Sequence, residues 1–383
     1  MPRSSTPLRI AMVGTRGVPA AYGGFETAVE EIGSRLAARG HHVLVYCRTG
    51  GATARNHLGM RLVHLPAVRS KSLETLTHTL LSAVHSLVNT PADVAFVFNA
   101  ANAPFLPIIR ARGVPAAVHV DGLEWKRAKW GPVGRRFYKL AERLSVRWAD
   151  ALIADAQGIA DYYTEEFGVA TELLAYGTKI VTDSSSDRLV ALGLEPGRYH
   201  LVVARFEPEN HIDLIVEGYA ASDAALPLVV VGTAPYAASY INRIADAATA
   251  DSRIRLLGGV WDQTVLDQLY AHAASYLHGH SVGGTNPSLL RAMGAGTAVL
   301  AWDVNFNREV LGDAGVFFHD ARRVTELIRE IETDSASARA RADRGKRRAI
   351  EFYDWDSVTD GYERLAERLV AGAARPRSRQ SRS

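Results

Sequence analysis

Residues 278–296 read HGHSVGGTNPSLLRAMGAG, and this stretch says most about the fold of the chain. Its glycines and small polar residues follow an apolar run and stand immediately before a helical pattern. Gly283 and Gly284 allow a tight backbone turn, and Pro287 suits the first turn of a helix over 287–293. Unpaired N–H groups at such a helix start bind anions such as a diphosphate. The amides expected to contribute are those of Thr285, Asn286 and Ser288. An ordinary strand–turn–helix connection would carry the same glycines, so this stretch alone leaves both interpretations open.

The size and composition of the chain indicate a globular protein of two domains. It has 383 residues, of which 47% are hydrophobic and 22% charged, and this length favours two hydrophobic cores. A membrane-spanning helix would require an apolar run of about twenty residues, and the sequence contains none. The start of the chain does not have the form of a signal peptide, so we expect a cytoplasmic protein. The single Cys47 excludes an intramolecular disulfide and a multi-cysteine metal site.

Short apolar runs alternate with helical patterns along the whole chain. In the first half, strands are expected at Leu8–Val13, His42–Cys47, Val94–Phe98, Val114–Val120 and Ala151–Ala154. In the second half, they are expected at Tyr199–Ala204, Leu228–Val231, Arg253–Leu257, Ala274–Leu277 and Ala298–Ala301. This alternation predicts an α/β fold of two Rossmann-like, doubly wound domains facing across a cleft, with ligands beyond the carboxyl ends of the strands.

The expected division of the chain follows from this alternation. Residues 1–182 would form the first domain and residues 183–352 the second. A C-terminal helix over 353–372 would cross back onto the first domain, and the Arg- and Ser-rich tail 373–383 is expected to be disordered. A continuous helical pattern is also expected over 322–350.

The loop at residues 14–24 follows the first strand and precedes a helix. It lacks G-x-G-x-x-G and G-x-x-x-x-G-K-[ST], which disfavours a dinucleotide cofactor and the usual nucleoside-triphosphate loop. Gly23 and Gly24 would let the backbone approach a phosphate or sugar, and Arg16 can pair with phosphate. Glu26 could equally serve only to cap the helix.

Two further segments end predicted strands with ionisable groups. His119 and Asp121 form a pair suited to positioning an acceptor hydroxyl or to general base catalysis, with Glu124 and Trp125 shaping a sugar pocket. A helix cap beside a surface aromatic is the alternative. Arg205 ends the first strand of the second domain, where a guanidinium neutralises a leaving diphosphate without an Asp-rich metal site.

Basic and aromatic residues crowd between Trp125 and Trp148, although the net charge of the chain is only +3. The basic residues are Lys126, Arg127, Lys129, Arg135, Arg136, Lys139, Arg143 and Arg147. The segment suits an anionic membrane surface, and a solvated helix packed on its own domain would look similar. No nucleic-acid-binding module accompanies the charge, so nucleic acid is not an expected partner.

The four stretches VGTRGVPAAYGGFET (13–27), HVDGLEWKRAKWG (119–131), VVARFEPEN (202–210) and residues 278–296 occur in this order. Together they resemble the GT-B retaining glycosyltransferases of family four, in particular the branch of bacterial polysaccharide β-1,4-rhamnosyltransferases. The resemblance covers nearly the whole chain. It implies that the domain of residues 1–182 binds the acceptor and that the domain of residues 183–352 binds the nucleotide sugar.

The resemblance implies roles for individual residues. Catalytic roles are implied for His119, Asp121 and Arg205. Donor binding is implied for Gly23, Gly24, Arg205, Asn210, Gly283, Gly284, Thr285, Asn286, Ser288 and Arg291. Acceptor binding is implied for Arg16, Tyr22, Asp121, Glu124, Trp125 and Lys126. No metal is implied. The chain departs from the wider family at Gly283 and Arg291, which occupy the positions of its paired glutamates, and at Glu209, Asn210 and His211, where a lysine is usual.

The activity implied is transfer of a deoxyhexose, L-rhamnose from dTDP-β-L-rhamnose, to a polyprenyl-diphosphate saccharide in cell-surface polysaccharide synthesis. No cofactor is expected besides the nucleotide-sugar donor, and the expected location is peripheral, at the inner face of the plasma membrane. A transferase for another donor, UDP- or GDP-hexose, or for a small acceptor would share every motif. A nucleotide-sugar epimerase and a non-catalytic nucleotide-sugar-binding protein are further alternatives.

Overall fold

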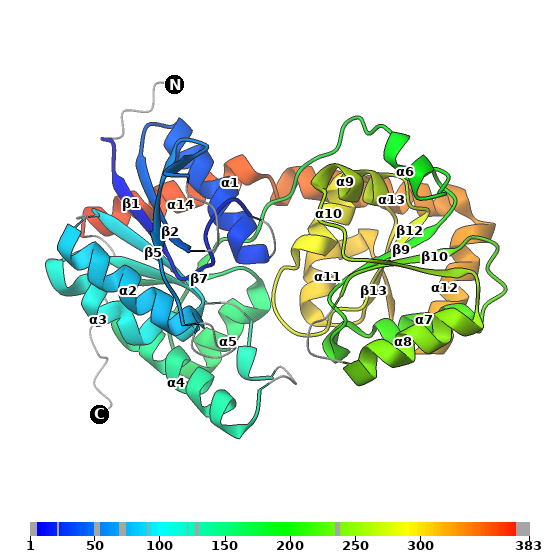
Figure 1. The fold of residues 1–383 in the computed structure, drawn as a ribbon, viewed down its shortest axis with the longest axis horizontal. Helices are drawn as coiled ribbons and strands as arrows, with labels where there is room; N and C mark the ends of the chain where they lie inside the picture. Colours follow the sequence, from blue (N-terminus) through cyan, green and yellow to red (C-terminus); the bar gives the residue numbers. More distant parts are fainter. Residues whose placement is uncertain are drawn as a thin grey trace. The chain divides into compact units, whose positions relative to one another are not determined.

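The computed structural model describes residues 6–20, 23–49, 54–68, 74–89, 92–120, 122–126, 130–233 and 238–372. The chain divides into two compact units (Figure 1). Unit 1 takes the residues up to Tyr176 and those from Trp355 on, and unit 2 is Gly177–Asp354. Each unit contains a parallel sheet covered by helices, so the prediction of two Rossmann-like domains with a C-terminal helix returning to the first is confirmed.

The sheet of unit 1 has the order β3-β4-β2-β1-β5-β6-β7-β8, and its pairings are parallel except for β3 with β4. Its strands are β1 (Arg9–Val13), β2 (His42–Arg48), β3 (Asn56–His57), β4 (Met60–Leu65), β5 (Val94–Phe98), β6 (Ala116–Val120), β7 (Ala151–Ala154) and β8 (Glu172–Leu173). β1 pairs with β2 on one side and β5 on the other, so the strand order reverses between β1 and β5. Ligands of doubly wound sheets bind at such a point, beyond the carboxyl ends of the strands.

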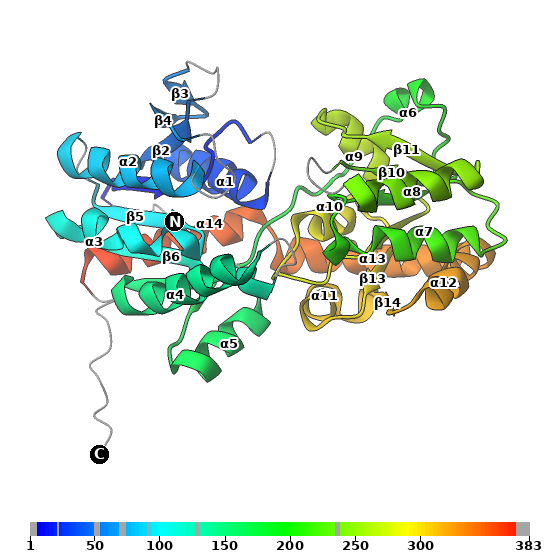
Figure 2. The same ribbon diagram turned by 60° about the horizontal axis from the view of Figure 1, so that its bottom comes forward.

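Helices cover both faces of this sheet (Figure 2). They are α1 (Gly24–Ala38), α2 (Glu74–Asn89), α3 (Leu106–Ile109), α4 (Pro132–Trp148), α5 (Gln157–Phe167) and α14 (Trp355–Val370). α1 lies beside α14, and it buries Val29, Ile32 and Leu36 at helical spacing. α2 and α4 both contact the short 3-10 segment Ala100–Phe105 that follows β5.

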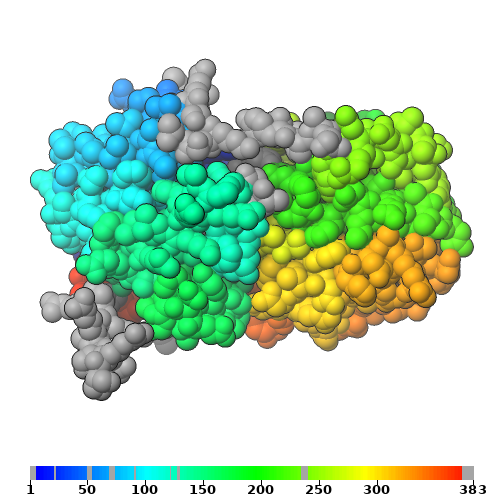
Figure 3. Space-filling view, turned by 90° about the horizontal axis from the view of Figure 1, so that it is seen from below, coloured from blue at the N-terminus to red at the C-terminus, as the bar shows by residue number. Residues whose placement is uncertain are grey.

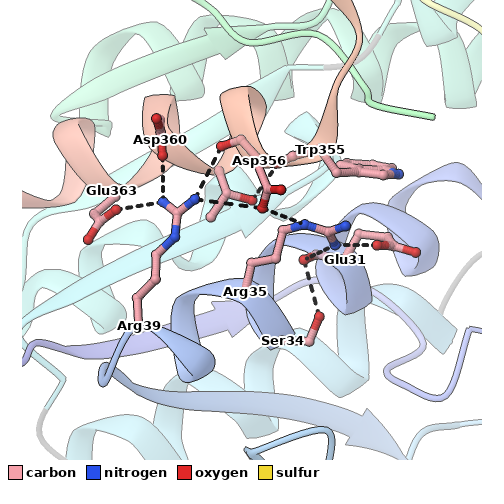
Figure 4. A network of polar contacts seen from close by, with 9 residues as sticks. Glu31, Ser34, Arg35, Arg39, Trp355, Asp356, Asp360 and Glu363 are labelled. Atoms are coloured by element: carbon pink, nitrogen blue, oxygen red, sulfur yellow. Dashed lines mark hydrogen bonds and ion pairs between the residues drawn. The ribbon is translucent and has the colours of Figure 1, made fainter. Parts of the chain in front are cut away.

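An ionic network fastens α14 to α1 (Figure 4). Arg39 Nη1 lies 2.6 Å from Glu363 Oε2 and 2.8 Å from Asp360 Oδ1, and Arg35 Nε lies 3.1 Å from Asp356 Oδ1. Arg39 and Glu363 are mostly buried, with side chains 16% and 8% exposed. The C-terminal helix is therefore held to unit 1 by charge as well as by packing.

Unit 2 has a wholly parallel sheet in the order β11-β10-β9-β12-β13-β14. Its strands are β9 (His200–Val203), β10 (Leu228–Val231), β11 (Ile254–Gly258), β12 (Ser275–His278), β13 (Val299–Trp302) and β14 (Val316–Phe318). The strand order reverses between β9 and β12, so the loops after these two strands mark its expected ligand edge.

The helices of unit 2 form two groups. α7 (Ile212–Ala220) contacts α8 (Ala238–Ala250) and α12 (Ala321–Thr333), while α10 (Pro287–Ala295) contacts α9 (Gln263–Ala271) and α13 (Ser335–Phe352). α6 (Asp187–Ala191) and α11 (Asn305–Leu311) complete the set of α-helices in the described part of unit 2. The first group packs its apolar residues on the sheet around a core that includes Ile215, Leu228 and Leu327.

The prediction of continuous helix over 322–350 is wrong. α12 ends at Thr333 and α13 begins at Ser335, because Asp334 adopts a non-helical conformation and its carboxylate accepts a hydrogen bond from Ser337 N at 3.0 Å. The predicted tail 373–383 lies outside the described residues.

Candidate active site

The loop after β1 is built on glycines that permit close backbone approach. Gly14 and Gly17 both have φ of 103°. A Cβ on Gly14 would lie 2.4 Å from Phe98 O, and one on Gly17 would lie 2.5 Å from Cys47 Sγ. The loop therefore runs tightly over the ends of β5 and β2, which only glycine permits here.

The start of α1 carries an acidic side chain next to the predicted donor glycines. Gly23 (φ 115°) precedes the helix and Gly24 begins it. The Glu26 carboxylate accepts a hydrogen bond from Arg16 N at 3.1 Å, and a Cβ on Gly23 would lie 2.1 Å from Glu26 Oε2. A phosphate placed there would have to displace this carboxylate. The neighbouring predicted residue Tyr22 lies outside the described residues.

His119 lies inside an aromatic cage near the carboxyl end of β6. Its ring centroid is 5.1 Å from that of Phe25, 5.8 Å from Phe98 and 5.6 Å from Tyr176. The side chain is 2% exposed, and among the described residues neither ring nitrogen has a hydrogen-bond partner. Burial lowers the pKa of His119 to about 3, so the imidazole is neutral at physiological pH. Its predicted partner Asp121 lies outside the described residues.

The predicted acceptor residues 124–126 form a short 3-10 turn. Glu124 is 7% exposed and accepts a hydrogen bond from Trp130 Nε1 at 3.1 Å. Trp125 and Lys126 instead line an open groove of about 630 Å³. The remaining groove residues come from α4 and are Pro132, Arg135, Arg136 and Lys139. Glu124 is thus a buried carboxylate, whereas Trp125 and Lys126 belong to a cationic groove.

In unit 2, Arg205 follows β9 with its side chain 36% exposed, and its Nη2 lies 3.3 Å from Glu207 Oε2. Asn210 Nδ2 donates to Arg205 O at 2.7 Å, so Asn210 Oδ1 accepts from His280 Nδ1 at 2.7 Å. Both ends of the Asn210 amide are thus used within the protein. Asn210, predicted to bind the donor, joins the loops after β9 and β12 and fixes the backbone of Arg205.

The same two loops meet through a glycine and a stacked ring pair. A Cβ on Gly279 would lie 2.1 Å from Asn210 O, so no other residue fits without movement. His211 donates from Nδ1 to Gly279 O at 2.8 Å, and its ring stacks on Trp302 with centroids 3.7 Å apart and planes 6° apart. The ends of β9, β12 and β13 are therefore locked together at one edge of the sheet.

The glycine-rich stretch 278–286 leads into α10 as expected. Gly283 has φ of 135°, and Thr285 is 4% exposed. The prediction that the Ser288 amide is unpaired is wrong, because Asn286 Oδ1 accepts a hydrogen bond from Ser288 N at 2.9 Å and caps the helix. An anion could use this amide only by displacing the Asn286 side chain. Gly284 completes the turn before this cap.

Arg291, also predicted to bind the donor, is neutralised inside unit 2. Its Nη2 lies 2.6 Å from Asp267 Oδ1, and its Nη1 donates to Gln263 Oε1 at 2.8 Å. Lys179 Nζ lies 2.7 Å from the other oxygen of Asp267. Burial raises the pKa of Asp267, but these two cations outweigh it and hold that pKa below its usual range. Arg291 therefore fastens α10 to α9 and is not an unpaired cation.

Several site residues at this edge were missed by the sequence analysis. They are His278, His280, His211 and Trp302. His278 ends β12, is 4% exposed, and has an Nε2 without a partner among the described residues. Asn307 Nδ2 donates to His280 O at 2.9 Å. The paired histidines of the quoted HGH sequence were the available signal, because polar side chains seldom end a buried strand without a role.

No group of three or more His, Cys, Asp or Glu residues gathers as metal ligands would in the part of the chain that is described. Metal independence stays a prediction. None of the described helices is long and apolar enough to cross a membrane.

The sequence matches two domain families over most of its length. Residues 23–177 match the glycosyl transferase 4-like domain, and residues 191–348 match glycosyl transferases group 1. The chain belongs to the group 1 glycosyltransferases. Its two matched regions lie in unit 1 and unit 2 respectively, apart from one residue at the boundary.

Known proteins place this glycosyltransferase among GT-B folds. Sucrose-phosphate synthase from Thermosynechococcus elongatus is similar with a TM-score of 0.80 at 20% identity, over 95% of this chain and 99% of that one. HepE of Anabaena, in complex with UDP-glucose, is similar with a TM-score of 0.75 at 16% identity, over 94% and 100%. O-antigen chain mannosyltransferase B of Escherichia coli is 27% identical over 168 residues, which span 42% of this chain and 43% of that protein.

Proposed function

We propose that this glycosyltransferase is a retaining hexosyltransferase that moves L-rhamnose from dTDP-β-L-rhamnose to a hydroxyl of a polyprenyl-diphosphate saccharide. Membership of the family supports sugar transfer, and a protein of the same fold is known in complex with UDP-glucose. The O-antigen mannosyltransferase supports a role in cell-surface polysaccharide synthesis. The choice of rhamnose depends on the four motifs that resemble the rhamnosyltransferase branch.

The observation that carries the proposal is the setting of Arg205. It stands at the carboxyl end of β9, with its backbone fixed by Asn210 and its partly exposed guanidinium held by Glu207 at 3.3 Å. A departing nucleoside diphosphate gains negative charge as the glycosidic bond breaks, and a preorganised guanidinium stabilises that charge. We therefore propose transfer without a metal, with Arg205 on the leaving diphosphate.

His119 is assigned a hydrogen-bonding role at the acceptor side. With its pKa lowered to about 3, the imidazole is a weak base, so it holds a sugar or hydroxyl better than it removes a proton. The departing diphosphate would take the acceptor proton on the same face of the sugar, which gives retention. Of the two roles predicted for His119, positioning an acceptor hydroxyl and general base catalysis, we propose the first.

The proposed location is the inner face of the plasma membrane. α4 exposes Val133 and Leu140, which are 81% and 51% exposed, beside the basic side chains of the same helix. An apolar and cationic helix face suits the boundary of an anionic bilayer. The protein would then reach the lipid-linked acceptor while the lipid of that acceptor stays in the membrane.

The test is a donor panel of dTDP-β-L-rhamnose, UDP-glucose, UDP-N-acetylglucosamine and GDP-mannose, with donor hydrolysis and binding measured for wild type and Arg205→Ala. We expect preference for dTDP-rhamnose and a loss of about 10²–10³-fold in turnover for Arg205→Ala. Arg198→Ala is the matched control, because Arg198 lies near the other end of β9 with its side chain 63% exposed. Equal turnover in wild type and Arg205→Ala would remove Arg205 from the mechanism.

A mannosyl donor is the second candidate, favoured by the O-antigen mannosyltransferase. Preference for GDP-mannose in the panel would replace rhamnose and keep the rest of the proposal. Tight binding without hydrolysis or transfer would favour a non-catalytic protein.

A further inference from the structure

The groove of unit 1, lined by Trp125, Lys126, Pro132, Arg135, Arg136 and Lys139, has a chemistry that the proposed donor site does not use. We propose that this groove binds the diphosphate of the lipid-linked acceptor, with the first isoprenoid units against its apolar residues. This inference rests on the proposed function and names the part of the acceptor that unit 1 recognises.

The cationic side chains of the groove are not neutralised by ion pairs with described residues. Lys126, Arg135, Arg136 and Lys139 line one groove, and in the described part of the chain no carboxylate forms an ion pair with any of them. Arg110 of the same unit, by contrast, forms an ion pair with Asp150 at 2.5 Å. Several cations left together repel one another unless an anion joins them. A diphosphate supplies more than one negative charge and several acceptor oxygens for guanidinium groups.

The nearby carboxyl groups do not take the role of that anion. Glu142 on α4 is 5% exposed and accepts a hydrogen bond from Tyr162 at 3.1 Å. Burial raises the pKa of Glu142 to about 7, although Tyr162, Trp125 and Lys139 act to lower it, so Glu142 offsets the charge of Lys139 only in part at neutral pH. Glu124 is buried and is held by Trp130 at 3.1 Å. The groove therefore keeps its positive charge.

The groove also has an apolar part, formed by Trp125 and Pro132. Lys139 Nζ lies 4.3 Å from the Trp125 ring centroid and Lys126 Nζ lies 5.4 Å from it, so the indole holds both cations at its surface. Pro132 adds a rigid apolar wall. A free inorganic anion would not make favourable contacts with these apolar surfaces. A prenyl diphosphate would, because its charged head is joined directly to a hydrocarbon chain.

The groove is open to a ligand from solvent. α4, teal-green near residue 140, lies open on the face of unit 1 that Figure 3 shows. Val133, 81% exposed, follows Pro132 on the same helix. A lipid chain leaving the groove would therefore continue along an exposed apolar side chain instead of entering water alone.

The experiment uses the full chain and soluble probes. Binding of farnesyl diphosphate, farnesyl phosphate and farnesol is measured by calorimetry and tryptophan fluorescence, below their aggregation concentrations and with saturating dTDP to fill the donor site. The groove variant is Arg135→Gln with Lys139→Gln, and the matched control on the same helix is Arg143→Gln with Arg147→Gln. We expect farnesyl diphosphate to bind best and the groove variant to weaken it about tenfold or more, with the control changing it less than about twofold.

Three outcomes would overturn the proposal. If dTDP competed with farnesyl diphosphate, the diphosphate would bind at the donor site and not in the groove. If the groove variant and the control variant weakened binding equally, the effect would come from net charge alone. If farnesol bound as tightly as farnesyl diphosphate, the anion would not contribute to recognition. Anionic vesicles without diphosphate form a separate arm: if the groove variant lost only vesicle binding, the groove would be a bilayer contact. Melting temperatures show whether each variant is folded. If the double variant is unstable, the single variant Arg135→Lys is used in its place. Donor hydrolysis reports on the proposed function independently, because it requires no acceptor.

Discussion

At the scale of single residues, two buried histidines lie at or next to the carboxyl ends of strands, near the candidate sites. His119 in β6 and His278 in β12 are 2% and 4% exposed, and burial lowers the pKa of each to about 3. The sequence places both at strand ends but says nothing of their surroundings. Whether a histidine is an exposed base or a neutral, caged ring depends on side chains from other segments, such as Phe25 and Tyr176 around His119.

The caged His119 predicts acid sensitivity. The unfolded chain binds a proton near pH 6.5 and the folded state only near pH 3, so stability is lost as the pH falls between these values. From pH 7 to pH 5 the loss is about 2 kcal/mol per such histidine. In His119→Phe, which keeps an aromatic ring in the cage, the fall in unfolding free energy over this interval should be smaller by about that amount in urea titrations.

His319→Gln is the control for this measurement, because the side chain of His319 is 70% exposed. It should change the fall in stability between pH 7 and pH 5 less than His119→Phe does. An identical fall in stability for wild type and His119→Phe would show that His119 is not a buried neutral group.

At the scale of elements, the capping residues decide where helices begin and what their ends can bind. Asp334 divides the helical pattern after α12, and Asn286 closes the start of α10. Both residue types favour N-caps, but apolar periodicity continues across Asp334, so the pattern alone predicts one helix. β4 and β14 were not predicted either: β4 (MRLVHL) is interrupted by polar residues, and β14 (VFF) is too short to stand out.

The attachment of α14 to α1 predicts unequal effects for two arginines at the C-terminal end of α1, Arg35 in its last turn and Arg39 at its C-cap. Leu8 N donates to His41 Nδ1 at 3.1 Å, so His41 Nε2 donates to Glu363 Oε1 at 3.1 Å. Burial raises the pKa of Glu363, but His41 and Arg39 outweigh it and lower that pKa. Arg39→Ala would leave this carboxylate buried with one partner fewer, and we expect a loss of about 2–3 kcal/mol in unfolding free energy.

Arg35→Ala is the matched comparison, and it should cost less than about 1 kcal/mol. The partner of Arg35 on α14, Asp356, has a side chain that is 72% exposed. Urea unfolding of both variants in low and high salt measures the difference. Equal losses in the two variants would mean that burial of Glu363 does not set the strength of the attachment.

At the scale of the whole molecule, each unit has its own sheet, its own core and its own set of predicted site residues. Unit 2 holds Arg205 and the loops after β9 and β12, while unit 1 holds His119 and the groove. The two substrates should therefore protect different parts of the chain.

Hydrogen exchange measures this separation. With dTDP-rhamnose we expect slower amide exchange in residues 204–211 and 279–286, and with farnesyl diphosphate in residues 130–140. A ligand at about 100 times its dissociation constant should add about 2.7 kcal/mol to the stability of the state that binds it. Donor protection confined to unit 1 would reverse the assignment of the two units.

The sequence by itself determined the two α/β domains, because apolar runs such as those of β5, β7 and β10 mark buried parallel strands with the same bounds that the structure has. It also placed Arg205 and the glycine-rich turns at strand ends. Only the tertiary structure decided that Asn210 joins His280, that Arg291 is neutralised by Asp267, and that Trp125 shares a groove with α4. The physical reason is that sequence periodicity reveals which face of an element is buried, whereas the partner of a polar side chain depends on the strand order that brings distant loops together.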